Sequence, residues 1–503
     1  MTISSSTTAP RPAARARVAR LDLAVVALSG AMAAQAALLA WLSVARYRAF
    51  WTGRFDLGNM TQAVWSTLHG HPLATTDAAG HQISRLAAHV DPVLVAFAPL
   101  LAVWRSPASL LVAQAVIVAT GAVPIFALGR RWLGDDRLAL AGAAVYLLYP
   151  PLMWATLTEF HPVTLAIPLL AWCIWAAETR RDAVLVACAV LACLTKEEVG
   201  LSLVMLGLWM AVRHGRRRAG ALLAAASAAW VAVAFAVVIP HFNGGHGSQF
   251  AARYGDLGGG AGGVATTIFT RPWEAADQAV SVHRLTYLLA LLVPLAFLPL
   301  ASPLLALCAA PELVLNLLAN WWPQHSIEFQ YVAVPTPFLV ASALLGLARL
   351  RAATRPRWLV TLTEPAGGVA LGLVALVLVS GVRLGPLPWW RDVPLGSHSR
   401  TDQYAVGSHA RVLDEAVALV PPGARVSAGN YLGSHLSERA RIYTFPVVRD
   451  AQWVLVDRLR PAIGAVVRPR EHARAVADLL AGGRFRVVLD RDGVLVLHRV
   501  GAS

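Results

Sequence analysis

The sequence predicts an α-helical polytopic membrane protein with about eleven transmembrane helices and a small C-terminal α/β domain outside the membrane. Three observations predict this fold class. Of the 503 residues, 57% are hydrophobic and only 14% are charged, and the mean hydropathy is +0.57, which is too apolar for a soluble chain of this length. Short arginine clusters separate the apolar runs, as they do in membrane proteins. From about Ser399, short strand-like and helical patterns replace the apolar runs.

The N-terminal residues 1–20 mix Ser, Thr, Ala, Pro and Arg, and this composition predicts a disordered cytoplasmic tail. The apolar run that follows continues to Val44, so it predicts an uncleaved anchor, although Ala31-Met32-Ala33 imitates a signal-peptidase site. Segments of about 20 apolar residues, with shorter ones allowed where neighbours bury them, predict the crossings. They are residues 22–45, 108–129, 138–157, 162–177, 183–195, 199–213, 220–240, 284–302, 304–319, 331–349 and 367–384.

The arginine clusters orient this threading. With this set of crossings the clusters all fall on one side, which the positive-inside rule identifies as the cytoplasm, and the odd number of crossings then places the C-terminal region outside. They are Arg11/Arg15/Arg17/Arg20, Arg130/Arg131/Arg137, Arg180/Arg181, Arg213/Arg216/Arg217/Arg218 and Arg349/Arg351/Arg355/Arg357. We therefore expect a multi-pass membrane protein with a cytoplasmic N-terminus. The predicted parts are the tail 1–20, a transmembrane domain 21–384 with outer loops 46–107 and 241–283, a linker 385–398, and an extracytoplasmic α/β domain 399–503.

Two segments of the outer loops receive their own interpretation. Pro92–Trp104 is apolar over only about 13 residues, too short for a crossing, and predicts a helix that lies in the outer interface. Gly255–Gly263 is glycine-rich and is interpreted as a flexible linker in preference to a phosphate-binding loop, because no strand precedes it.

The C-terminal domain has mixed periodicity. Helical patterns cover Tyr404–Val420 and Glu471–Ala481. Strand patterns cover Arg425–Ala428, Ile442–Phe445, Trp453–Val456, Phe485–Leu489 and Val494–His498, and Asp490-Arg491-Asp492-Gly493 is a hairpin signal between the last two. No Gly-x-Gly-x-x-Gly follows a strand, so we assign this domain no nucleotide.

Composition also bears on the partners. The net charge of +15 arises from arginines between apolar runs, a pattern that indicates contact with membrane lipids, and no aromatic and basic nucleic-acid module is present. The four cysteines, Cys173, Cys188, Cys193 and Cys308, lie in apolar runs without metal-like spacing, so the sequence indicates neither disulfides nor a zinc site.

One polar stretch interrupts the apolar part of the chain. Lys196 is the only lysine, and Glu197 and Glu198 follow it between two apolar runs. Charged groups at such a place are costly and usually mark a functional site, although the two glutamates could simply neutralise the lysine. The threading places this stretch in an outer turn.

Other polar residues fall on the same outer side. Asp56 stands at the start of a predicted helix, where it is either a catalytic carboxylate or an ordinary N-cap. The candidate substrate-binding residues are Lys196, Glu198, Arg253, His325, Glu328, Gln330 and Tyr331, and Glu312, Asn316 and Asn320 share one helical face nearby.

Two short pairs raise the question of a metal. His89 and Asp91, and Glu159 and His161, are each two residues apart in adjacent outer segments, so each pair offers nitrogen and oxygen ligands to a divalent ion. Ordinary capping and ion pairing explain such pairs equally well. A divalent metal ion is the one cofactor that the sequence suggests.

Several motifs together resemble the bacterial membrane protein family with domain of unknown function 2079. They are Phe55-Asp56-Leu57-Gly58 with Gln62-Ala63-Val64-Trp65, His89-Val90-Asp91-Pro92, Glu159-Phe160-His161-Pro162, Leu194-Thr195-Lys196-Glu197-Glu198 and Ile327-Glu328-Phe329-Gln330-Tyr331. They span most of the chain. That family has no established activity, so this resemblance names no substrate.

The order of parts is also similar to that of the GT-C class of glycosyltransferases. These enzymes have an acidic residue in the first outer loop, interfacial helices before the second crossing and a Thr-Lys turn, to which Asp56, Pro92–Trp104 and Thr195-Lys196 correspond. The resemblance implies a GT-C-like fold, a sugar donor linked to polyprenyl phosphate, and a catalytic or metal-binding role for the first-loop acid. In that class the acid often belongs to an acidic pair, whereas Asp56 has Phe55 and Leu57 beside it.

The resulting hypothesis is sugar transfer from a polyprenyl phosphate donor at the outer face of the membrane, with Asp56 as general base and Lys196, helped by Arg253 or His325, holding the departing phosphate. Two alternatives stay open at this point. One is a transporter or flippase of a lipid-linked or acidic solute, and the other is a non-catalytic protein of envelope assembly. The oligomeric state is not predicted.

Overall fold

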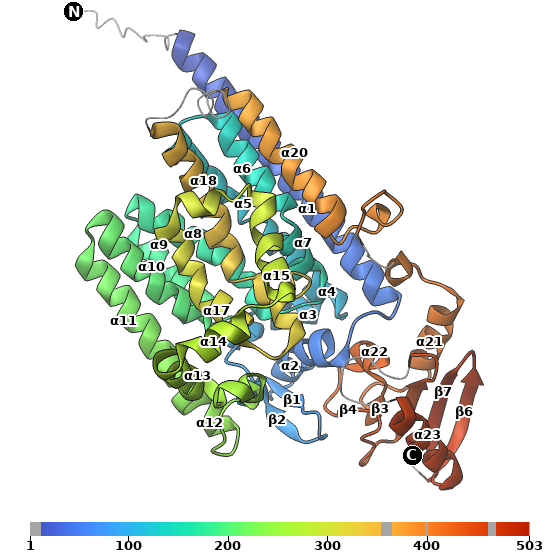
Figure 1. Ribbon diagram of the computed structural model, residues 1–503. Helices are drawn as coiled ribbons and strands as arrows, with labels where there is room; N and C mark the ends of the chain where they lie inside the picture. The colour runs from blue at the N-terminus through green and yellow to red at the C-terminus, as the bar shows by residue number, and fades with distance from the viewer. Residues whose placement is uncertain (1–11, 354–364, 398–400, 461–468, 502–503) are drawn as a thin grey trace, which may run out of the picture.

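The structure, a computed structural model, describes residues 12–353, 365–397, 401–460 and 469–501 (Figure 1). Figure 1 shows a domain of long helices and, at the end opposite the N-terminus, a small sheet domain next to the hairpin of the first outer loop. The chain is thus a mostly helical membrane protein with a C-terminal α/β part, as the sequence predicts.

Within the described residues, five helical segments are long and apolar enough to cross a membrane. They are Leu23–Arg48 of α1 (Pro12–Arg48), α4 (Ala108–Ala119) with α5 (Ala122–Leu133), η4 (Pro162–Leu165) with α8 (Ala166–Thr179), α11 (Arg217–Val233) with η5 (Ala234–Val238) and α12 (Ile239–Phe242), and α20 (Ala366–Leu384). Helix α20 packs against α6 (Asp136–Leu148), and α6 also contacts α1 (Figure 1).

Two bent helix pairs bring the number of candidate spans to as many as 7. They are α6 (Asp136–Leu148) with α7 (Pro150–Leu157), bent by 42°, and α14 (Pro272–Ala279) with α15 (Val282–Leu292) and η7 (Val293–Leu295), bent by 72°. The first bend falls at Pro150 and Pro151, because proline removes a backbone donor and pushes the preceding residue out of the helical region. The predicted count of eleven is not confirmed.

The remaining predicted crossings correspond to helices outside these candidate spans. These are α9 (Asp182–Cys193), α10 (Val199–His214), the segment Pro303–Leu318, which comprises α16 (Pro303–Ala306), η9 (Leu307–Ala309) and α17 (Ala310–Leu318), and α18 (Pro335–Ala352). Small residues let α10 and α11 approach closely: a Cβ added at Gly207 would lie 2.4 Å from the carbonyl oxygen of Gly220. Such close contacts are how helices pack where no water drives them together.

Two expectations about irregular segments are wrong. Helix α1 begins at Pro12, inside the predicted disordered tail, while residues 1–11 lie outside the described residues. The glycine-rich segment is not a flexible linker: it forms η6 (Gln249–Leu257) and α13 (Gly260–Thr270). Buried Leu257 and Val264 pack with Leu318 of α17 and anchor the segment despite its glycines. Arg355 and Arg357 of the last arginine cluster lie outside the described residues.

The first outer loop is folded throughout. It contains η1 (Arg54–Gly58), α2 (Asn59–Leu68), the antiparallel hairpin β1 (Ala74–Thr76) and β2 (Gln82–Ser84), η2 (Arg85–Ala87), η3 (Pro92–Phe97) and α3 (Ala98–Val103). The last two confirm the short apolar helix predicted at Pro92–Trp104.

The C-terminal domain contains a five-stranded sheet in the order β4-β3-β5-β7-β6. The elements are α21 (Ser408–Ala418), β3 (Val426–Ala428), α22 (Asn430–Gly433), η14 (Ser434–Leu436), β4 (Ile442–Thr444), β5 (Trp453–Asp457), α23 (Pro469–Ala481), β6 (Phe485–Arg491) and β7 (Val494–Arg499). Strands β4, β3 and β5 are parallel, and β7 and β6 are antiparallel to their neighbours. The five predicted strands and the hairpin are confirmed; Asp492 and Gly493 both have positive φ, as a tight Asp-Gly hairpin turn requires.

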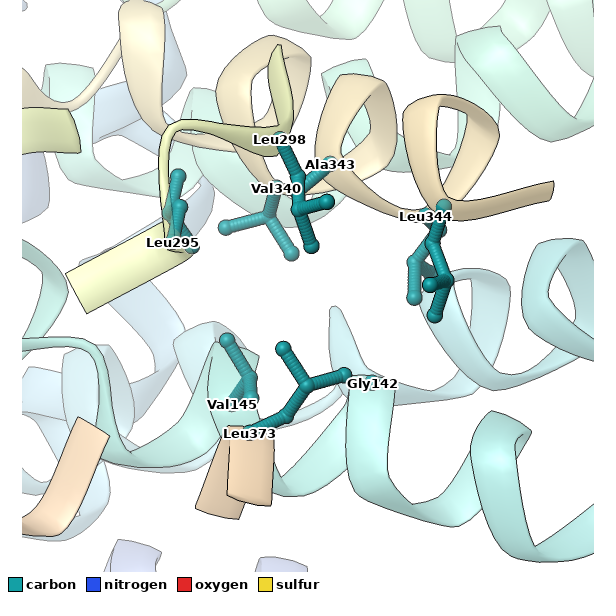
Figure 2. A pocket seen from close by; sticks show the side chains of 9 residues that line it. Gly142, Val145, Leu295, Leu298, Val340, Ala343, Leu344 and Leu373 are labelled. Atoms are coloured by element: carbon teal, nitrogen blue, oxygen red, sulfur yellow. The ribbon is translucent and has the colours of Figure 1, made fainter. Parts of the chain in front are cut away.

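Two apolar cavities lie among the helices. Figure 2 shows the first, lined by aliphatic side chains such as Leu295, Val340 and Leu373. Its volume is about 10 Å³, too small for more than a single water. The second, about 270 Å³, lies among α15, α16, α17 and α18 and is lined by leucine, proline and alanine. Neither cavity has a charged lining residue, so chemistry must be sought elsewhere.

Candidate functional site

Asp56 lies on η1, a single π-helical turn that enters α2. Its side chain is 50% exposed and its Oδ1 lies 3.2 Å from Nε2 of His161. It makes no cap bond to the helix that follows, so the N-cap interpretation of this residue is not what the structure shows. Burial tends to raise the pKa of Asp56, but the hydrogen bond and charge of His161, with the charges of Arg85 and Arg253, bring the net pKa below its usual range. The carboxylate is therefore ionised and reachable.

Glu159 holds the turn that carries Asp56. Its two carboxylate oxygens accept the backbone N–H groups of Gly53 and Leu57, at 2.9 and 3.0 Å. Glu159 has φ 67°, a left-handed conformation that is uncommon for a residue with a side chain and that persists only when the surroundings impose it. Burial, and then the neighbouring charge of Asp56, raise the pKa of Glu159 to about 8.

Gln114 supplies those surroundings. Its amide nitrogen donates to the carbonyl oxygens of Thr156 and Glu159, at 2.7 and 2.6 Å, and its oxygen accepts from the backbone of His161 and the hydroxyl of Thr164. It is fully buried in α4. Gln114 is not among the residues predicted from the sequence. Its only signal there is that an amide side chain interrupts the apolar run 108–119. We call Asp56, Glu159, His161 and Gln114 the acid cluster.

The first loop is fastened to the turn that carries Lys196. Glu197 accepts from the ring of His89 (Nδ1 to Oε1, 2.8 Å) and from the backbone N–H of Val90 (2.9 Å). Arg85, another residue missed by sequence reasoning, forms a buried ion pair with Asp91 at 2.7 Å. Burial and the nearby cations Lys196 and Arg85 lower the pKa of His89 to about 3, so its ring is neutral.

Lys196 forms an ion pair with Glu198. Burial opposes its charge, but Glu198, Glu312 and Glu197 raise its pKa above the usual range. The carboxylates around Lys196 offset its charge, in agreement with the interpretation that the neighbouring glutamates neutralise the lysine. Its ammonium lies 5.5 Å from the centre of the Tyr331 ring.

Arg253 approaches the same ring. Its guanidinium donates to the Tyr331 hydroxyl at 3.1 Å and to the Gln324 side chain at 3.3 Å, and lies 4.5 Å from the Phe250 ring centre. Among the residues that the structure describes, no carboxylate forms an ion pair with Arg253. Its charge is thus less compensated than that of Lys196. We call Lys196, Glu198, Arg253, Gln324 and Tyr331 the cation cluster.

A chain of contacts joins the first loop to the cation cluster. Phe250 stacks on His89, with ring centres 4.4 Å apart, and the guanidinium of Arg253 also lies against the Phe250 ring. Since Arg253 also lowers the pKa of Asp56, the two clusters lie within electrostatic reach of each other. The charge of Arg253 therefore favours the ionised form of Asp56.

The other predicted binding residues are distributed around this region. His325 contacts His283, with ring centres 5.0 Å apart, and burial and Arg284 lower its pKa. The backbone oxygen of Glu328 accepts from Thr158 at 2.7 Å, and Gln330 begins η11 (Gln330–Val332). Asn316 donates to the backbone of Tyr331, while Asn320 donates to Asp256. Within the described structure, these contacts do not bring His325 to Lys196 or Arg253.

The four candidate metal ligands are divided among separate partners. His89 pairs with Glu197, Asp91 with Arg85, and His161 with Asp56, while Glu159 accepts backbone donors. Within the described ranges, no three His, Cys, Asp or Glu side chains gather closely enough to hold a metal ion. The donor set does not fit one shared ion, so we derive no step through a metal.

The sequence matches a known family over most of its length. The family described as a predicted membrane protein, DUF2079, matches residues 46–496. No curated protein is similar enough to count as a relative. Among solved structures, ArnT from Cupriavidus metallidurans bound to undecaprenyl phosphate is similar at 14% identity and a TM-score of 0.48, over 94% of this chain and 98% of that chain. A likeness at this level carries nothing about activity.

Proposed function

The chain belongs to the DUF2079 family of predicted membrane proteins, and on that premise we propose that it transfers a sugar from a polyprenyl phosphate donor to an acceptor hydroxyl. In this proposal the acid and cation clusters face the outer side of the cytoplasmic membrane, with the N-terminus in the cytoplasm and the C-terminal domain outside. The order of parts that resembles GT-C glycosyltransferases supports this reaction class.

One observation carries the proposal. Asp56 is half exposed, ionised and within electrostatic reach of Arg253, whose charge no described carboxylate pairs. A transfer from a phosphate-linked sugar needs these two groups: a base for the acceptor proton and a cation for the phosphate that departs. Asp56 and Arg253 are each partly buried, and partial burial makes such charges act more strongly than in water.

The reaction then follows from the positions of the side chains. The acceptor oxygen bonds to the anomeric carbon of the sugar while Asp56 takes its proton. The bond from that carbon to the phosphate oxygen breaks, and the electron pair stays on the phosphate. Arg253 donates hydrogen bonds to the phosphate, Lys196, which also lies near the Tyr331 ring, adds positive charge, and His161 orients the Asp56 carboxylate.

The test compares envelope lipids and glycans, by mass spectrometry, in cells that have and lack the gene. We expect a polyprenyl phosphate sugar to accumulate without the gene and one glycan or glycolipid to disappear. Restoring the wild-type gene should reverse both changes. Identical lipid and glycan profiles in all strains would contradict the proposal.

A further inference from the structure

The C-terminal domain contacts the turn that carries Asp56 directly. Asn430, the first residue of α22, accepts with its Oδ1 the backbone N–H groups of Arg54 and Phe55, at 2.9 and 3.4 Å. These two amides lie between those of Gly53 and Leu57, which Glu159 holds. Four amides of one short turn are thus bound by two side chains, one from the helical domain and one from the C-terminal domain.

Neighbouring contacts make this junction tight. The hydroxyl of Ser434 donates to the carbonyl oxygen of Thr52 at 2.9 Å. Arg54 is 1% exposed and donates to the carbonyl oxygen of Ile442 at 2.9 Å. A Cβ added at Gly433 would lie 2.6 Å from the Cβ of Arg54, so only glycine lets the two segments approach this closely.

Aromatic stacking fixes the same interface. The ring of His435 lies between those of Tyr47 and Phe50, with ring centres 4.1 and 3.8 Å apart. Phe50 is fully buried in the apolar core of the C-terminal domain, although it belongs to the first loop. The first loop and residues 429–437 therefore form one packed unit, on which Asp56 sits.

From this juxtaposition we propose that the C-terminal domain forms one wall of the Asp56 site and that Asn430 is a positioning residue for Asp56. The catalytic part of this inference rests on the function proposed above, whereas the holding of the turn does not. Displacement of a reacting group by about 1 Å can cost roughly 100-fold in rate, so a side chain that fixes two amides beside Asp56 affects turnover without touching substrate.

The test uses the full chain in lipid nanodiscs and measures amide hydrogen exchange at residues 53–58. Asn430→Leu removes the acceptor at similar size, and Asn430→Ala is a milder removal for use if the leucine variant does not fold. Asn430→Asp keeps an acceptor oxygen. Gln452→Leu is the matched control, because the Gln452 oxygen accepts the backbone N–H of Arg425 inside the same domain.

We expect exchange at Arg54 and Phe55 to accelerate at least roughly tenfold in Asn430→Leu and Asn430→Ala, and to stay near the wild-type rate in Asn430→Asp and Gln452→Leu. Turnover should fall by about 100-fold in the first two variants with an unchanged donor KM, and recover in Asn430→Asp. Wild-type exchange at these two amides in Asn430→Leu and Asn430→Ala would overturn the inference. Faster exchange with unchanged turnover in those two variants would also overturn it. If the wild-type chain transfers no sugar, the proposed function fails, and the exchange rates alone still decide whether Asn430 holds the turn.

Discussion

The acid cluster and the cation cluster are held in different ways. In the acid cluster, Glu159 and Gln114 bind backbone groups, so the chain itself is fixed around Asp56. In the cation cluster, Lys196 and Arg253 contact side chains, namely Glu198, Gln324 and the Tyr331 ring. Backbone anchors fix a position, whereas long cationic side chains adjust to an arriving anion. In the proposed function, this contrast assigns a rigidly held base to the acid cluster and an adaptable phosphate site to the cation cluster.

The largest expected effect comes from removing the base. Asp56→Asn should lower the rate of transfer by about 10²–10⁴-fold, the usual contribution of a positioned acid or base, with little change in folding because Asp56 is half exposed. Asp77→Asn is the control, since Asp77 lies in the same loop and pairs with His81. The rate of product formation in membranes measures both. A rate for Asp56→Asn equal to that of Asp77→Asn would remove Asp56 from the mechanism.

This site illustrates what the sequence could predict. Asp56, Lys196 and Arg253 stood out as charges near apolar runs, and periodicity and the Asp492-Gly493 turn predicted the strands of the C-terminal domain. The left-handed backbone of Glu159 and the 376-residue separation of Asn430 from Arg54 depend on tertiary packing, which no local pattern encodes. For the same reason the sequence ranked Lys196 above Arg253, because only the folded chain places Glu312 beside the lysine.

The hydrogen bonds that hold the acid cluster should contribute to the thermal stability of the protein. Gln114→Leu leaves several buried groups without partners, at about 1–3 kcal/mol each, and should lower the apparent unfolding temperature by several degrees. Gln35→Leu is the matched control in α1, because Gln35 makes one bond, to the carbonyl oxygen of Leu147 at 3.3 Å. Thermal unfolding in detergent measures the difference. Equal shifts in the two variants would mean that Gln114 does not anchor the acid cluster.

Substitutions in the cation cluster should change the affinity for the donor substrate. Arg253→Met removes the guanidinium that donates to Tyr331 and, in the proposed function, to the donor phosphate. Hydrogen bonds to a charged group are worth about 1.5–3 kcal/mol, so the donor KM should rise by roughly 10–100-fold. Arg253→Lys should be intermediate, since it keeps the charge without the planar fork. Arg271→Met, at an exposed ion pair with Glu274, should leave KM unchanged. Initial rates at varied donor concentration give these values, and an unchanged KM in Arg253→Met would exclude a phosphate contact.

The smallest effect concerns pH. Because the pKa of Glu159 is about 8 in the folded chain and lower when unfolded, the folded state binds more protons, and stability falls as the pH rises from about 5 to about 8. The apparent unfolding temperature of the wild type should fall by roughly 2 °C more over this range than that of Glu159→Gln. Parallel pH profiles for the two proteins would show that Glu159 is already ionised at pH 5.

The central claim is that Asp56 and Arg253 act together in sugar transfer from a polyprenyl phosphate. The most direct measurement places the purified chain in liposomes made with lipids from the deletion strain, adds the envelope acceptor fraction, and quantifies free polyprenyl phosphate and sugar-bearing product by mass spectrometry. We predict one polyprenyl phosphate released for each sugar transferred, and both products formed about 10²–10⁴-fold more slowly with Asp56→Asn. Movement of the intact donor across the bilayer without cleavage would contradict the claim and identify a transporter instead.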